Sequence, residues 1–120
     1  MRTRYDDIAA YVTKDGSEIR ELMHPDHHPV RNQSLAEAVV QPGQRTQLHR
    51  HAATEEIYHV TAGAGMMTLG SERFAIGVGD TIAIPPDTPH CIAATGTAVL
   101  RILCCCSPAY AHGDTEIIDG

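Results

Sequence analysis

The sequence predicts one all-β domain of the sandwich or barrel class. About nine short segments have strand character, and glycine or proline separates most of them. No helix of useful length is expected after the N-terminal region, and 120 residues make a single core of ordinary size. We therefore expect an N-terminal arm and loop over 1–33, a barrel over 34–106 and a C-terminal tail over 107–120.

The N-terminal arm is expected to hold a short helix and a strand. Tyr5 to Tyr11 fits the helix, Lys14 to Ser17 is a turn signal, and Glu18 to Met23 fits the strand. The loop from His24 to Pro29 then places three histidines among two prolines. Because proline restricts its geometry and no histidine pair has strand or helix spacing, we interpret it as a polar surface loop and not as a second metal site.

The strands expected after this loop follow one another at short intervals. Turn signals such as Gly70-Ser71 end them, and the tail from Pro108 to Gly120 is expected to be irregular. The expected strands are Ser34 to Val40, the segment with His49 and His51, Glu55 to Thr61, Met66 to Leu69, Arg73 to Ile76, Thr81 to Ile84, His90 to Ala94 and Val99 to Cys106.

Composition and charge exclude several classes of partner. Nine basic against fifteen acidic residues give a net charge of −6, and no basic cluster exists to bind a phosphate backbone. The chain has no tryptophan and one phenylalanine, so it lacks aromatic platforms for single-stranded nucleic acid. No apolar run approaches the ~20 residues that span a bilayer, and residues 1–16 lack the apolar core of a signal peptide. We expect a cytoplasmic protein without nucleic-acid or membrane partners.

The four cysteines do not predict a disulfide framework. Cys104, Cys105 and Cys106 are adjacent, and adjacent cysteines do not readily reach disulfide geometry. No CxxC spacing marks a thiolate site, so we interpret all four as small buried hydrophobes. On the final strand Cys104 and Cys106 share the inner face with Leu100 and Ile102, which predicts two thiols near the interior without a ligand role.

The segment from Gly43 to Gly63 carries the strongest chemical signal. His49 and His51 lie at i and i+2, so a strand directs both imidazoles to one face. Glu56 follows within reach of a tight bend, and His90 comes from a later segment. Two imidazoles and a carboxylate suit a first-row metal ion, and His90 completes three nitrogens and one oxygen.

Alternation along the strands then predicts the residues around this site. If Glu56 points inward, so does Tyr58, and if His49 points inward, so do Gln47 and Arg45 at the mouth. Tyr58 is the candidate general base, and Gln47 and Arg45 are candidates for the substrate pocket. Apolar walls are expected from Phe74, Ile76, Ile82, Ile84 and Ile92.

These residues resemble the paired motifs of the cupin family, small β-barrels with a metal site inside. The first motif has glycine, two histidines, glutamate and glycine at set spacings, and every position is filled here, by Gly43, His49, His51, Glu56 and Gly63. The second motif is matched by Gly79, Pro85 and His90. Asp87 stands where the family has glycine and Ala94 where it has asparagine; aspartate tolerates the turn conformation that glycine adopts.

The resemblance implies a double-stranded β-helix of jelly-roll type, with one divalent ion held by His49, His51, Glu56 and His90. The ligand set suits iron, manganese, zinc, nickel or copper and does not name the metal. Three functions stay open: an oxygenase acting on a small organic molecule, which we favour slightly; a Lewis-acid isomerase, cyclase or lyase; and a small-ligand or metal-binding module without turnover. The family resemblance also implies a homodimer, with the N-terminal strand reaching a neighbouring subunit.

Overall fold

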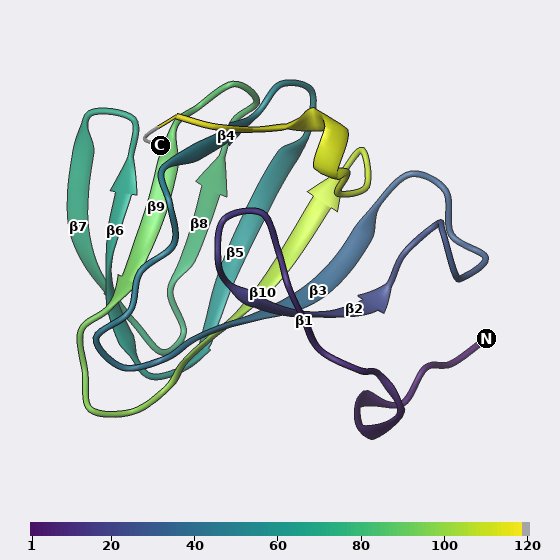
Figure 1. The fold of residues 1–120 in the computed structure, drawn as a ribbon, viewed down its shortest axis with the longest axis horizontal. Coiled ribbons are helices and arrows are strands. Elements are labelled where there is room, and N and C mark those ends of the chain that lie inside the picture. Colours follow the sequence, from purple (N-terminus) through teal and green to yellow (C-terminus); the bar gives the residue numbers. More distant parts are fainter. Residues whose placement is uncertain (119–120) are drawn as a thin grey trace.

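The computed structural model describes residues 1–118 and confirms the all-β prediction (Figure 1). Over these residues its two 3-10 helices are η1 (Tyr5–Asp7) and η2 (His112–Asp114), and no helix is long and apolar enough to cross a bilayer. The strands are β1 (Tyr11–Val12), β2 (Glu18–Met23), β3 (Ser34–Val40), β4 (His49–His51), β5 (Glu55–Ala62), β6 (Ala64–Leu69), β7 (Glu72–Gly77), β8 (Thr81–Ile84), β9 (His90–Ala94), β10 (Leu100–Ser107) and β11 (Thr115–Ile117).

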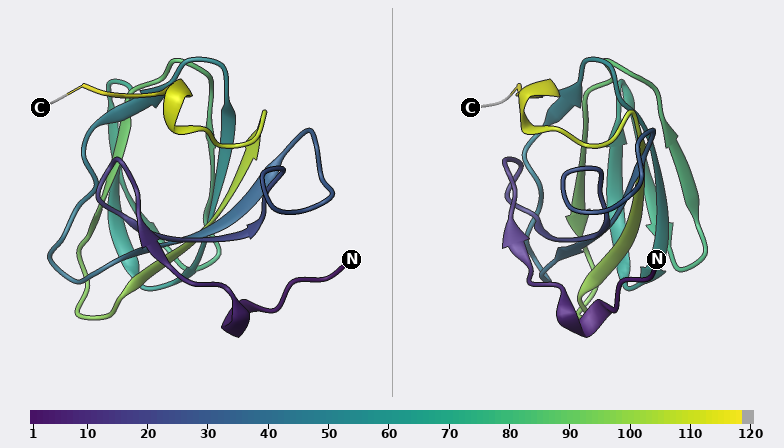
Figure 2. Two further views of the ribbon diagram at one scale, coloured as in Figure 1. Left: turned by 45° about the vertical axis from the view of Figure 1, so that its right-hand side comes forward. Right: turned by 90° about the vertical axis from the view of Figure 1, so that its right-hand side faces the viewer.

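Two antiparallel sheets face each other. One has six strands in the order β1-β2-β3-β10-β5-β8, and the other has five in the order β11-β4-β9-β6-β7. The views in Figure 2 show both sheets curving around a shared interior, with the C-terminal segment at the upper end and η1 at the lower end. Strands distant in sequence therefore present their inner faces to one space.

The core follows the alternation of each strand. In β5 the buried positions are Glu56, Tyr58 and Val60, and in β10 they are Leu100, Ile102, Cys104 and Cys106. Four of the expected wall residues are buried, and Phe74 is partly buried and packs against the core. Burial of every second side chain is what a sheet with one wet face requires, so periodicity predicted these positions well.

The C-terminal segment differs from the prediction of an irregular tail. It forms η2 and then β11, which pairs with β4 so that Thr115 lies opposite His51 and Ile117 opposite His49. A strand of three residues is too short to show alternation in the sequence. It forms here because β4 offers an edge with which it pairs. The result is a strand placed directly beside the two histidines of β4.

The N-terminal arm packs on its own chain. Strand β2 pairs with β3 of the same chain, and β1 pairs with β2. Ahead of them, the Tyr5 hydroxyl donates to Glu37 and the Arg101 guanidinium contacts both. Within this single chain β3 offers Glu18–Met23 an antiparallel edge, and the expected reach of this strand to a neighbouring subunit stays a prediction.

Candidate metal centre

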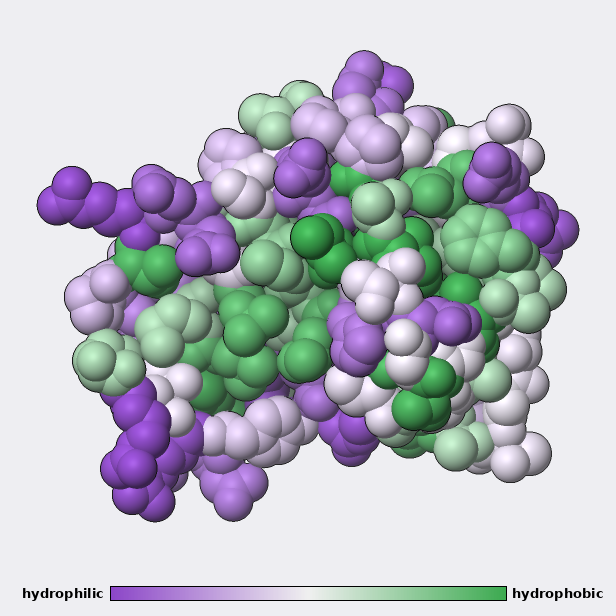
Figure 3. All heavy atoms as spheres, turned by 180° about the vertical axis from the view of Figure 1, so that it is seen from behind, coloured by the Kyte–Doolittle hydropathy of each residue, from purple (hydrophilic) through white to green (hydrophobic). Residues whose placement is uncertain are grey.

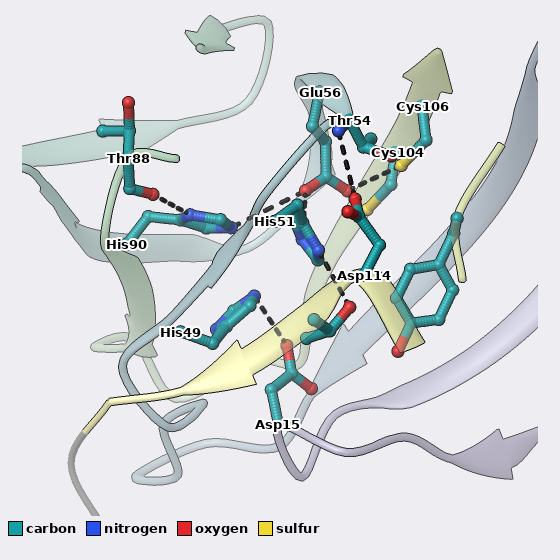
Figure 4. A network of polar contacts seen from close by, with 12 residues as sticks. Asp15, His49, His51, Thr54, Glu56, Thr88, His90, Cys104, Cys106 and Asp114 are labelled. Carbon is teal, nitrogen blue, oxygen red and sulfur yellow. Dashed lines mark hydrogen bonds and ion pairs between the residues drawn. The ribbon is translucent and has the colours of Figure 1, made fainter. Parts of the chain in front are cut away.

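Three buried histidines converge between the sheets. His49 and His51 come from β4 and His90 from β9, and the register places His49 directly opposite His90. Their exposed fractions are 2%, 5% and 0%, and one ring nitrogen from each lies within 4.8 Å of the other two. Figure 4 shows the three rings from these two neighbouring strands together with the acidic side chains that approach them.

Hydrogen bonds to the backbone fix two of these rings. Nδ1 of His49 donates to the Gln47 carbonyl at 2.7 Å, and Nδ1 of His90 donates to the Thr88 carbonyl at 2.9 Å. A carbonyl only accepts, so both Nδ1 atoms carry the proton and both neutral rings keep a lone pair on Nε2. The Nε2 atoms are those that point into the site.

His51 is oriented by the C-terminal segment. Its Nδ1 lies 2.9 Å from the Thr115 hydroxyl, which itself donates to the Ala111 carbonyl at 3.0 Å. Because that hydroxyl proton is already used, the Thr115 oxygen accepts from Nδ1 of His51. The third ring therefore also presents a lone pair at Nε2.

Glu56 reaches the same point from β5 in the opposite sheet. Its Oε2 accepts the Cys106 thiol at 3.2 Å, while Oε1 lies 3.3 Å from Nε2 of His51 and 3.6 Å from Nε2 of His90. Glu56 Oε1 and His90 Nε2 are fully buried and have no hydrogen-bond partner. Two buried acceptors without a donor are costly and call for a bound partner.

The electrostatics favour an anionic carboxylate at Glu56. Burial raises the pKa of Glu56, but the His51 and His90 rings outweigh it and hold the pKa at about 2. The pKa of His49 is lowered, first by burial and then by His90. A cation, either a metal ion or a proton, therefore suits the space among these atoms.

The spacing also fits a metal ion. Two atoms bonded to one ion at about 2.1 Å lie about 3.0 to 3.4 Å apart at octahedral or tetrahedral angles. The approaches of Glu56 to His51 and His90, at 3.3 and 3.6 Å, are close to that range. The three histidines thus fit a first-row divalent ion, and the Glu56 carboxylate lies beside two of them.

Tyr58 lies in the cavity beside the histidines, as alternation predicted. Its ring is edge-on to His90, with centroids 6.0 Å apart. The cavity is also lined by Cys104, Cys106 and Tyr110. Burial first, then the Glu56 charge, raises the pKa of Tyr58 well above its usual value. Tyr58 is therefore a neutral phenol that can donate a hydrogen bond, and the general-base role that the sequence suggested stays a prediction.

Gln47 and Arg45 do not line this cavity, and the alternation that placed them there is wrong. Both are exposed, and Thr46 between them is buried at 4%. The chain before His49 is not a strand: Thr46 exchanges hydrogen bonds with Ile92, and the Gln47 amide donates to the Asp15 carbonyl. This irregular segment breaks the period of two, so Arg45 and Gln47 face outward.

Sequence reasoning missed two residues that shape the site. Asp15, read as part of a turn, places Oδ2 at 3.4 Å from Nε2 of His49, and Thr115 holds His51. Neither carries a motif or a periodic signal of its own. Only the pairing of β11 with β4 and the position of the β1–β2 turn bring them to the histidines.

The loop before His90 keeps the shape of the second motif despite its substitution. Asp87 has a positive φ of 62°, the left-handed region that glycine adopts freely and aspartate tolerates. Its amide donates to the His51 carbonyl at 2.7 Å, and its carboxylate lies 3.4 Å from the Arg50 guanidinium. Aspartate here ties the His90 loop to β4.

Comparison with known proteins identifies relatives. The cupin domain model matches residues 36–106. An uncharacterized protein of Methanocaldococcus jannaschii is 53% identical over 119 residues, covering 99% of this chain and 95% of its own length. Two solved structures are similar in fold. The polyketide cyclase RemF of Streptomyces resistomycificus has a TM-score of 0.82 and 21% identity, and the match covers 100% of this chain and 86% of RemF. The nucleoside dehydratase Pac13 of Streptomyces has a TM-score of 0.78 and 18% identity, and the match covers 98% of this chain and 90% of Pac13.

Proposed function

Because this chain belongs to the cupin family, we propose that it is an enzyme that binds one divalent first-row metal ion through His49, His51, His90 and Glu56. We propose further that it catalyses a non-redox reaction, a dehydration, cyclisation or isomerisation, on a small carbonyl compound. The observation that carries this proposal is the protonated Tyr58 phenol in a cavity lined by His49 and His51, with the His90 ring beside it.

In this proposal four residues bind the metal ion and Tyr58 donates a proton or a hydrogen bond to the substrate. A bound ion supplies Lewis acidity toward a carbonyl oxygen. The three imidazoles and Glu56 hold it, and their own hydrogen bonds fix their orientation. Tyr58, kept neutral by burial, donates a proton or hydrogen bond to a substrate oxygen. Loss of water or rearrangement needs no external oxidant, so the reaction balances with the substrate alone.

Two neighbours in fold agree with this class of substrate. A neighbour in fold is named a polyketide cyclase and another a nucleoside dehydratase, which supports, by analogy of fold only, a substrate rich in oxygen atoms.

Oxygenation, slightly favoured by the sequence alone, is the second candidate. Three imidazoles and a carboxylate also suit iron or manganese, with dioxygen as the second substrate.

The test of both candidates is metal analysis of protein purified without added metal, followed by incubation with hydroxy ketones, diketones and polyketones. Mass spectrometry detects dehydration or cyclisation, and an oxygen electrode detects oxygenation; oxygen uptake with an oxygenated product would overturn the non-redox proposal.

The matched variant for this test is Tyr58→Phe. It removes only the phenolic hydroxyl, so we expect turnover to fall roughly 100- to 10,000-fold, the range for loss of a general acid. Metal content should not change, since Tyr58 is not among the proposed ligands. A Tyr58→Phe protein with full activity would remove the proton-donor role, and wild-type protein that binds metal but transforms no substrate in the panel would favour a module without turnover.

A homodimer is also part of this proposal. Leu35, Cys105 and Ile57 stand in one row across β3, β10 and β5 on the outer face of the six-stranded sheet. Leu35 and Ile57 are 37% and 42% exposed, and the space-filling view shows a face on which hydrophobic side chains gather (Figure 3). Light scattering at micromolar concentration tests the dimer, and Ile57→Lys should give monomer if this row is the interface.

The cytoplasmic location expected from the sequence stays a prediction.

A further inference from the structure

The turn between β1 and β2 places a carboxylate next to His49. Asp15 lies in this turn, and its side chain is only 13% exposed. Its Oδ1 accepts three hydrogen bonds: from the Thr13 hydroxyl at 2.7 Å, from the Ser17 amide at 2.9 Å and from the Ser17 hydroxyl at 2.7 Å. These bonds fix the rotation of the carboxylate and leave Oδ2 free to face the site.

Oδ2 of Asp15 faces a lone pair. It lies 3.4 Å from Nε2 of His49, and Nδ1 of that ring already donates its proton to the Gln47 carbonyl. A neutral His49 thus offers no proton toward Asp15, and two acceptors meet in a nearly dry place. Such an approach is favourable with a cation between them, either a metal ion or a proton carried by His49, and the experiments below separate the two. Figure 4 shows Asp15 approaching His49 from a segment remote from Glu56.

We propose that Asp15 is a further ligand of the metal ion, an inference that rests on the metal-binding function proposed above. Its 3.4 Å approach to His49 resembles the 3.3 Å approach of Glu56 to His51, so the two carboxylates complement different members of the triad. Three neutral imidazoles and two carboxylates balance the charge of a divalent ion. With Asp15 bound, the ion would have one position fewer for a substrate oxygen.

This ligand couples the metal to the N-terminal arm. The Gln47 amide donates to the Asp15 carbonyl at 2.9 Å, and Lys14 Nζ donates to the Thr115 carbonyl at 2.7 Å. The turn therefore rests on the segment before His49 and on β11, both next to the ligands. A bond from the metal to Asp15 would fasten the arm over the cavity that Thr13, Asp15 and Ser17 help to line.

The direct test is titration of metal-free protein with Co²⁺, followed by calorimetry and by visible absorption. Asp15→Asn keeps an oxygen for the three hydrogen bonds of Oδ1 and replaces Oδ2 with an amide, so the turn is preserved. We expect roughly 10- to 100-fold weaker binding and a changed Co²⁺ spectrum. Asp26→Asn removes the same charge from a carboxylate that is 78% exposed and should bind like the wild type.

Hydrogen exchange on the wild-type protein provides a readout that needs no variant. Adding Co²⁺ should slow exchange of the Ser17 and Gln47 amides, whose acceptors are both on Asp15. Protection of β4 and β9 without protection of these amides would overturn the inference, as would equal Co²⁺ affinity and spectra for wild type and Asp15→Asn. Failure of the wild type to bind Co²⁺ or Zn²⁺ would instead overturn the proposed metal-binding function itself.

Discussion

Two groups of three histidines occur in this chain, and only one is arranged as a metal site. His49, His51 and His90 are buried on neighbouring strands, and each uses Nδ1 as a donor, which leaves Nε2 free. In the loop from His24 to Pro29 the roles are reversed. Nδ1 of His28 accepts the His24 amide at 2.9 Å, and Nδ1 of His24 accepts the Asp26 amide at 3.0 Å.

The difference shows that the number of histidines does not make a metal site. In the loop, the imidazole lone pairs satisfy backbone amides, and the remaining nitrogen of His24 lies 2.7 Å from the Tyr110 carbonyl, to which it donates. These rings act as local caps that hold an irregular segment together. In the triad, backbone and Thr115 acceptors fix the rings and spare the lone pairs for an ion.

The largest expected effect is loss of a triad ligand. His51→Ala removes one of three nitrogens from the centre, so we expect metal content after purification to fall to near background. His27→Ala combined with His28→Ala should leave metal content unchanged, because those rings do not face the triad. Elemental analysis of the proteins, purified in parallel, makes the measurement; full occupancy in His51→Ala would refute the ligand assignment.

Acid is expected to release the ion over a defined window. Metal binding requires neutral imidazoles, and protons compete below the ordinary histidine pKa of about 6.5. Burial lowers the pKa of His49, so affinity should hold above that value and fall as pH drops through roughly 6 to 4. Glu56, with a pKa of about 2, stays ionised throughout and does not cause the fall.

Calorimetric titration at several pH values measures this profile together with the protons taken up per ion lost. The His27→Ala, His28→Ala double variant serves as the control and should give the same curve. A profile flat between pH 6 and 4 would contradict a centre built on three imidazoles.

A smaller effect is expected from the residue that orients His51. Thr115→Val keeps the volume of the side chain but removes the oxygen that accepts from Nδ1 of His51. Loss of such a hydrogen bond weakens metal binding by roughly 10- to 100-fold. Competition with a chelator of known affinity measures the change, and Thr68→Val in β6, outside the centre, is the matched control. Unchanged affinity would mean that packing alone orients His51.

The smallest effect is expected in the loop, and on stability rather than on metal. His24→Ala leaves the Tyr110 carbonyl and the Asp26 amide without their partners. We expect the free energy of unfolding to fall by about 1 to 3 kcal/mol, measured by urea denaturation of metal-free protein. Metal affinity should stay at the wild-type value; a large loss would mean that this loop supports the centre.

Local patterns in the sequence determined much of the fold and part of the site. Glu18–Met23, Ser34–Val40, Thr81–Ile84 and His90–Ala94 are strands with the predicted bounds, because alternation and turn residues act over a few positions. The same local spacing placed His49, His51 and Glu56 on inner faces. Their burial needed no knowledge of the partner strands.

Tertiary structure alone decided the rest. Gln47 and Arg45 face outward because the chain before His49 pairs irregularly with Ile92 and Asp15, which no local spacing reveals. Thr115 and Asp15 reach the histidines because β11 joins β4 and the β1–β2 turn folds over them. Contacts between segments so distant in sequence depend on which strand edges meet, and that is a property of the assembled sheets and not of any one segment.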